Sequence, residues 1–296
     1  MSSVVNRLFK KKLINPPGWL PSNTMFEGQT GSVAYGAVGE SSDIDVVGFC
    51  IPPKDLVFPH LSGEIPGFGR QISRFEQFQA HHISDQETRR EYDITVYSIV
   101  KFFQLTMENN PNMVDLLFLP RRCVLHSTSV YEHVRDHRHL FLHRGSYYEF
   151  RGYAASQLSK LKNGASRSNI KRRESYEKNG MDTKFAYHLV RLLLECEQIL
   201  TTGDLRLDRD SKIYQSIRRG EWSEERLTSW FENKEKSLET LYSSSKLPDR
   251  PPEDEIKKIL LECMEMHYGN LTDAVVDPDR SDQLVRELQE LVKRYS

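Results

Sequence analysis

Gly31-Ser32-Val33-Ala34-Tyr35-Gly36 and, shortly after it, Ser42-Asp43-Ile44-Asp45-Val46-Val47-Gly48-Phe49 are the stretches that decide the fold. The first is typical of a turn whose glycines let the backbone approach a ligand closely. The second is typical of a strand, in which alternation places Asp43 and Asp45 on one face and the apolar side chains between them on the other. Adjacent carboxylates repel each other unless a cation neutralises them, and such oxygen ligands suit Mg²⁺ bridged to phosphates. The two stretches together predict metal-assisted chemistry on a nucleotide.

A second metal ion at such a site needs a third carboxylate. Two divalent ions about 3.5 to 4 Å apart can hold both the phosphates and an attacking oxygen. Asp93 is the best candidate, because it lies early in a β-branched, alternating segment over residues 92 to 96. Glu91 is the second candidate and Asp85 the third. The simpler interpretation of the Asp-x-Asp strand, a solvated edge without a role, is weakened by the glycine-serine pair before it.

Composition fits a globular protein large enough for two domains. The chain has 296 residues, 38% of them hydrophobic and 10% aromatic, which is enough for packed cores. Its 41 basic and 42 acidic residues nearly cancel, so a nucleic-acid partner can be argued only from local clusters. The cysteines are widely separated and form no C-x-x-C pair, which indicates reduced, buried thiols and neither a zinc site nor a disulfide scaffold.

The pattern of apolar residues predicts no membrane partner. Residues 1 to 12 are basic, but no apolar segment of the kind found in a signal peptide follows them. No run approaches the 18 or so apolar residues that a membrane-spanning helix requires. We therefore expect a cytoplasmic protein.

The order of the predicted elements indicates an α+β fold: a mixed sheet with flanking helices over residues 1–125, followed by a helical domain over residues 126–296. In the first part the pattern predicts strands at residues 24–29, 43–51, 72–79 and 92–96, and helices at 98–109 and 113–118. In the second part it predicts helices at about 128–140, 145–163, 182–201, 209–219, 223–242, 253–268 and 281–296. The helical domain is expected to complete a nucleotide cleft and to bind the acceptor.

The predicted helix at 182–201 carries a narrow polar stripe between two apolar flanks. Lys184, His188, Arg191, Glu195 and Gln198 fall within an arc of about 80°. One interpretation is a structural ion pair between Lys184 or Arg191 and Glu195. The other, which we favour, is a grip on a triphosphate, in which Lys184 and Arg191 neutralise phosphates and His188 orients one of them.

A basic segment that begins in the last turn of the helix predicted at 145–163 and runs to Lys178 is a candidate contact for a phosphate backbone. Serine, glycine and Tyr176 lie between its cations, a pattern that suits nucleic-acid binding, although charged runs are more often simply solvated. The predicted acceptor contacts are Lys160, Lys162, Arg167, Lys171, Arg172 and Arg173. Elsewhere, His81 and His82 are interpreted as loop residues and not as a metal pair, because no third ligand is evident.

The glycine-serine pair, the Asp-x-Asp strand and the single aspartate of a later strand resemble the DNA polymerase β-like nucleotidyltransferase superfamily over residues 24 to 100. The resemblance implies a palm-like fold with Gly31 and Ser32 at the nucleotide phosphates. It implies that Asp43 and Asp45 ligate two Mg²⁺ ions, with Mn²⁺ as an alternative, and that Asp93 ligates one of them and activates the acceptor hydroxyl. The remaining candidate nucleotide-binding residues in this region are Tyr35 and Ser42.

Residues 24 to 203 also resemble one branch of that superfamily, a set of nucleotidyltransferases from bacteria and phages, some associated with RNA repair. The resemblance implies transfer of a nucleoside monophosphate from an NTP to a hydroxyl acceptor, with release of pyrophosphate. The leading acceptor is an RNA 3′ end, such as that of a tRNA in repair. The alternatives are AMPylation of a protein or small molecule, and a nucleotide-binding sensor without turnover. The three candidate carboxylates count against the sensor.

Overall fold

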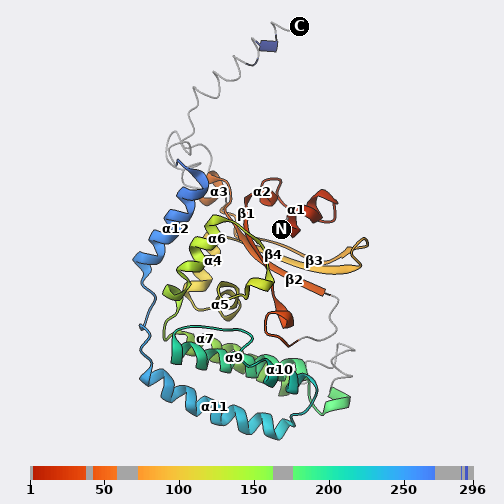
Figure 1. The fold of residues 1–296 in the computed structure, drawn as a ribbon, viewed down its shortest axis with the longest axis vertical. Coiled ribbons are helices and arrows are strands. Elements are labelled where there is room, and N and C mark those ends of the chain that lie inside the picture. Colours follow the sequence, from red (N-terminus) through yellow and green to blue (C-terminus); the bar gives the residue numbers. More distant parts are fainter. Residues whose placement is uncertain are drawn as a thin grey trace.

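A computed structural model describes residues 3–37, 43–58, 73–162, 176–270, 288 and 291–292. Figure 1 shows a twisted sheet flanked by short helices, with the helices of residues 146–244 stacked beside one another at one end of the molecule and the helix of residues 253–268 along one side. The N-terminal segment lies on the opposite side of the sheet from the helices α4 (Ile99–Met107), α5 (Pro111–Leu117) and α6 (Ser129–Asp136). This arrangement confirms the α+β prediction.

The sheet has five strands in the order β3-β4-β2-β1-β5. The strands are β1 (Thr24–Gln29), β2 (Asp43–Cys50), β3 (Gln77–Asp85), β4 (Arg90–Ser98) and β5 (Val124–Ser127). The pair β2 and β4 is parallel and the other three pairs are antiparallel, so the sheet is mixed. The parallel pair is central in the sheet. The residues of β4 alternate between buried and more exposed positions, and those of β2 do so until its last three residues, which are all buried. One face of this pair is therefore more accessible near the start of β2.

The helices of the first half follow local signals in the sequence. They are α1 (Val4–Lys10), α2 (Leu20–Asn23), α3 (Lys54–Val57), α4 (Ile99–Met107) and α5 (Pro111–Leu117). The Ser98 side chain accepts a hydrogen bond from the Lys101 amide and so caps α4. Asn110 caps α5 in the same way, and Pro111 takes the first helical position, where its missing N–H costs nothing.

The second half is helical, as predicted. Its helices are α6 (Ser129–Asp136), α7 (Ser146–Lys162), α9 (Thr183–Thr202), α10 (Ser211–Arg218), α11 (Glu224–Ser244) and α12 (Glu253–Tyr268). Asp182 accepts hydrogen bonds from the first amides of α9, and Gly203 ends that helix with a left-handed φ of 64°. The helix predicted at 281–296 lies almost entirely outside the described residues.

Three local predictions are corrected by the structure. The strand predicted at 72–79 is β3, Gln77–Asp85, so His81 and His82 lie within a strand and not in a loop. The alternation there is interrupted, which hid the strand's true extent. β5 was not predicted, because its few residues alternate too little to be recognised. The helix predicted at 128–140 ends at Asp136, and a separate 3₁₀ turn covers Arg138–Phe141.

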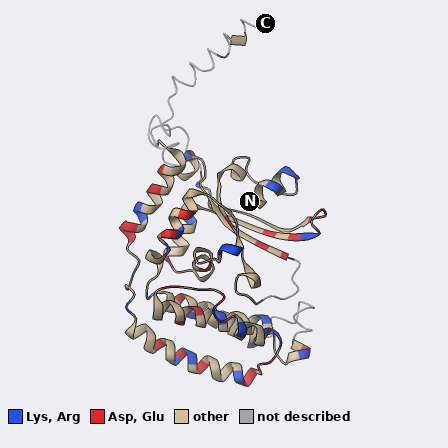
Figure 2. Cartoon of the chain, in the orientation of Figure 1, with Lys and Arg blue, Asp and Glu red and all other residues tan. Residues whose placement is uncertain are grey.

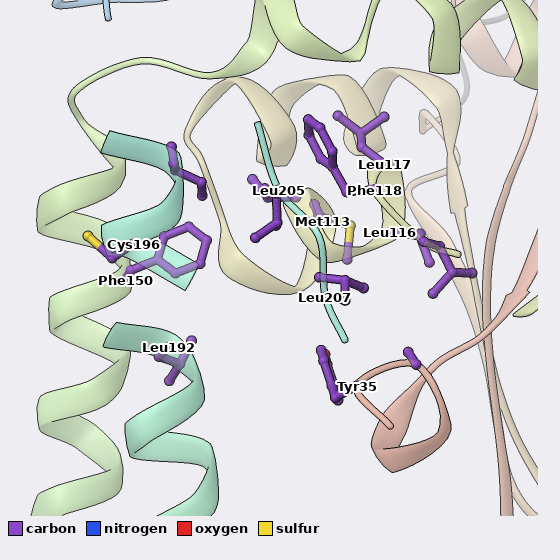
Figure 3. Close-up of a cluster of buried hydrophobic side chains, with 14 of the residues drawn as sticks. Tyr35, Met113, Leu116, Leu117, Phe118, Phe150, Leu192, Cys196, Leu205 and Leu207 are labelled. Atoms are coloured by element: carbon purple, nitrogen blue, oxygen red, sulfur yellow. The ribbon is translucent and has the colours of Figure 1, made fainter. Parts of the chain in front are cut away.

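The larger of two cores joins the sheet to the helices of the second half. It contains Phe26 and Phe49 from the sheet together with most of the buried side of α9. Figure 3 shows Tyr35 at the end of the glycine turn beside Leu192 and Leu207, with α5 packed behind them. The division near residue 125 stays a prediction, but this core crosses it.

The buried cysteines and the helix lengths agree with the expectations from composition. All four cysteines are buried and unpaired. In the described part of the chain, no helix has the combination of length and apolar character that crossing a membrane demands.

The smaller core packs α1 against the face of the sheet opposite α4 to α6. A buried carboxylate binds the start of that helix. Glu27 of β1 is fully buried, and its oxygens accept the backbone amides of Val4 (2.6 Å) and Val5 (3.2 Å). The Ser3 hydroxyl, which caps the helix, also donates to Glu27. One side chain therefore satisfies the amides that the first turn of a helix leaves unpaired.

Replacing Glu27 with alanine should lower the free energy of unfolding by about 2 to 4 kcal/mol, because it leaves buried donors without an acceptor. Glu232, an exposed residue of α11, is the matched control, and its replacement should change the free energy by less than about 0.5 kcal/mol. Denaturant unfolding measures both. Equal stability of the two variants would contradict this account of α1.

Candidate active site

The pairing of β2 with β4 brings the candidate carboxylates together. The parallel register places Asp45 opposite Asp93 and Asp43 opposite Glu91. Neighbouring strands are about 4.8 Å apart, so residues in register project from the same face side by side. Figure 2 shows acidic stretches on strands of this sheet. The three aspartates that the sequence singled out therefore share one face of the sheet, with Glu91 at its end.

Asp45 lies among other carboxylates, and they change its pKa. Burial raises the pKa of Asp45, and the charges of Asp93 and Asp43 raise it further, while Lys184 of α9 opposes them. Carboxylates in this relation are destabilised as anions until a cation lies among them. The donor set, three carboxylates on adjacent strands, fits a divalent cation such as Mg²⁺. Among the described residues, no three histidine, cysteine or acidic side chains already surround a common metal position.

The glycine turn is built against Asp45. The Thr30 amide donates to the Asp45 carbonyl oxygen (2.9 Å), and a 3₁₀ turn over Gly31–Val33 follows. Gly31 has a φ of 81°, and a Cβ placed there would lie 2.8 Å from Oδ2 of Asp45. Both the left-handed backbone and the nearby carboxylate therefore require glycine at this position.

A β-bulge holds Asp93 from the other side. The register of β3 against β4 shifts between Ala80 and Ile83, and His82 takes a φ of 55°, which is uncommon for a residue with a side chain. This backbone directs the His82 amide to Oδ1 of Asp93 (2.8 Å). Nδ1 of His81 lies 3.6 Å from the same oxygen. The two histidines that the sequence suggested were unimportant thus contact a candidate site residue.

A cleft of about 570 Å³ lies between the sheet and the helices of the second half. Gly31 and Thr95 line one wall, and Lys184, His188 and Arg191 of α9 line the other. Lys160 of α7, predicted as an acceptor contact, also lines it. The cleft therefore joins the glycine turn to the stripe on α9, as the predicted nucleotide site requires.

Arg191 is held in an ion-pair cluster within the cleft wall. Its Nη1 atom donates to Asp115 of α5 (2.5 Å) and to Glu195 (2.8 Å), and its guanidinium carbon lies 4.3 Å from the centre of the Tyr35 ring. The structural ion pair that the sequence left open for Arg191 and Glu195 is therefore present. A direct role of Arg191 in nucleotide binding stays a prediction. Asp115 was missed because only the tertiary fold brings it within 2.5 Å of Arg191.

The other candidate residues lie in different parts of the chain. Asp85, the third choice for the extra carboxylate, is buried and paired with Lys11 (2.9 Å), away from Asp45. Lys162 is exposed at the last turn of α7. Ser32 lies in the glycine turn, where its carbonyl oxygen accepts the Ala37 amide. The remaining candidates lie outside the described residues: Ser42, Arg167, Lys171, Arg172 and Arg173.

The family to which this chain belongs is shown by its similarity to known proteins. A family model, RlaP, the RNA repair pathway DNA polymerase beta family, matches residues 13–211. The chain belongs to this family. The match spans all five strands, the glycine turn and α9. It confirms the resemblance to polymerase β-like nucleotidyltransferases associated with RNA repair.

A solved structure was also matched, at low sequence identity. A solved nucleotidyltransferase-like protein from Exiguobacterium sibiricum is similar over 81% of this chain and 73% of its own, with 11% identity and a TM-score of 0.28. No curated protein sequence matched the chain.

Replacing Gly31 with alanine should weaken binding of Mg²⁺–NTP at least tenfold, because the new Cβ displaces either the turn or the Asp45 carboxylate. Gly152 in α7 is the matched control, since a Cβ there meets nothing within 4 Å. Its replacement by alanine should leave binding unchanged and add about 0.5 to 1 kcal/mol of stability. Titration calorimetry measures the affinity. Unaltered binding by the Gly31→Ala variant would contradict this description of the turn.

Proposed function

We propose that this protein transfers a nucleoside monophosphate from an NTP to a hydroxyl group of an RNA acceptor and releases pyrophosphate. The observation that carries the proposal is the parallel register that sets Asp45 beside Asp93, directly next to the glycine turn. The family match supports nucleotidyl transfer in an RNA repair pathway.

Each site residue has a part in this proposal. Asp43, Asp45 and Asp93 would hold two Mg²⁺ ions, with Mn²⁺ as an alternative, and the ions would neutralise the phosphates and acidify the acceptor hydroxyl. Asp93 has one oxygen fixed by the His82 amide, so its Oδ2 atom is the one proposed to accept the hydroxyl proton.

Cations across the cleft would bind the triphosphate. Lys184 is exposed, lines the cleft and lowers the pKa of Asp45, so its charge acts on the same space as the carboxylates. Lys160 and His188 line the same cleft. A triphosphate bound between the metal ions and these side chains would have its charge balanced from both sides.

The acceptor is proposed to be an RNA 3′ end, such as that of a tRNA. The family description names an RNA repair pathway, and the basic run that begins at Lys160 and Lys162 supports a phosphate backbone as partner. A cytoplasmic setting agrees with the four buried, unpaired cysteines.

The direct test incubates the protein with total RNA, Mg²⁺ and each α-³²P-labelled NTP in turn. We expect label at RNA 3′ ends and pyrophosphate release, both reduced at least 1,000-fold by Asp45→Asn, since the metal site loses a central ligand. Asp254→Asn, a fully exposed change on α12, is the control and should keep full activity.

The same assay separates the alternatives. Label on protein or on a small molecule would indicate AMPylation-type modification of another acceptor. NTP binding without pyrophosphate release would indicate a sensor. Transfer that survives Asp45→Asn would contradict the proposed site.

A further inference from the structure

A buried cluster of charged and phenolic groups lies between the glycine turn and the helices. It consists of Tyr35 after the turn, Asp115 on α5, and Arg191 and Glu195 on α9, each at most 6% exposed. Two carboxylates thus surround one guanidinium in the wall of the cleft. Burying these charges is costly unless their geometry is kept, so the cluster resists rearrangement.

The hydrogen bonds converge on a single oxygen. Oδ2 of Asp115 accepts both the Tyr35 hydroxyl (2.6 Å) and Nη1 of Arg191 (2.5 Å). The same Nη1 donates to Glu195, and the guanidinium lies over the Tyr35 ring at 4.3 Å from its centre. Tyr35 is therefore held through both its hydroxyl group and its ring face, by two helices at once.

Two further contacts fix the backbone that carries Tyr35. Nε2 of Gln215 on α10 donates to the Gly36 carbonyl oxygen (2.7 Å), and Arg122 donates to that of Ala34 (3.4 Å). The end of the turn is thus attached to α5, α9 and α10, while its beginning is attached to β2 through Thr30 and Asp45. Contacts with both the helices and the sheet therefore fix the position of this short turn.

The charge of the cluster argues against direct phosphate binding by Arg191. Nη1 of Arg191 is already shared between Asp115 and Glu195, and these side chains compete with a triphosphate for the guanidinium. Drawing the guanidinium toward a phosphate would also weaken two buried ion pairs. Lys184, which is exposed two helical turns earlier on the same stripe, has neither obstacle.

We propose that Tyr35, Asp115, Arg191 and Glu195 form a positioning clamp. The clamp sets the orientation of the Gly31–Val33 turn, and through that turn the affinity for the NTP phosphates, without touching the nucleotide. The proposal rests on the proposed nucleotide site but adds residues whose effect must pass through the turn.

The first experiment needs no nucleotide. Tyr35→Phe removes the hydroxyl bond to Asp115, whereas Tyr187→Phe removes an equally buried hydroxyl on α9 that has no hydrogen-bond partner. Amide hydrogen exchange in residues 31–37 should be at least tenfold faster in Tyr35→Phe and unchanged in Tyr187→Phe. Equal exchange in the two variants would overturn the clamp, whatever the protein's activity.

The second experiment is a double-mutant cycle on NTP affinity. Tyr35→Phe should raise the Kd for Mg²⁺–NTP about fivefold in the otherwise native protein and also when combined with Lys184→Ala. Combined with Gly31→Ala, which already displaces the turn or the Asp45 carboxylate, it should add less than twofold. A full fivefold effect in the Gly31→Ala background would show that Tyr35 does not act through the turn. If the native protein binds no NTP, the proposed function is refuted, and the hydrogen-exchange experiment alone tests whether the clamp positions the turn.

Discussion

The parallel pairing of β2 with β4 is the constraint on which the site depends. These strands are separated by a long stretch of chain, yet their register sets Asp45 beside Asp93 and gives the site its concentrated negative charge. Repulsion between the carboxylates makes this a costly arrangement in the absence of a cation. The two elements beside it, the glycine turn and the His81–His82 bulge, each contact one of the paired aspartates.

The helices of the second half form the wall of the cleft that lies opposite the sheet. The larger core runs from Phe26 and Phe49 of the sheet into α9, so the cleft wall that carries Lys184 is fixed relative to the carboxylates. The Arg191 cluster adds a polar link between the same two layers. Family membership, the shared core and the charge arrangement therefore support the same proposal, in which an NTP is bound between a metal-binding sheet and a cationic helix.

The features that could be predicted from the sequence are those that depend on residues close together along the chain. Alternation marked Asp43 and Asp45 as one face, and helical periodicity placed Lys184, His188 and Arg191 on one stripe, which the cleft confirms. The sequence could not show what faces that stripe, because Asp115 of α5 approaches Arg191 of α9 only in the folded chain. It also missed the bulge at His82, where the alternation on which strand prediction relies is interrupted.

The most direct measurement of the central claim is the number of Mn²⁺ ions bound per chain in the presence of a non-hydrolysable NTP analogue, followed by electron paramagnetic resonance. If Asp43, Asp45 and Asp93 form a two-metal site, the native protein should bind two ions, and Asp45→Asn should lose at least one of them. An unchanged stoichiometry in Asp45→Asn, or no binding by the native protein, would contradict the account.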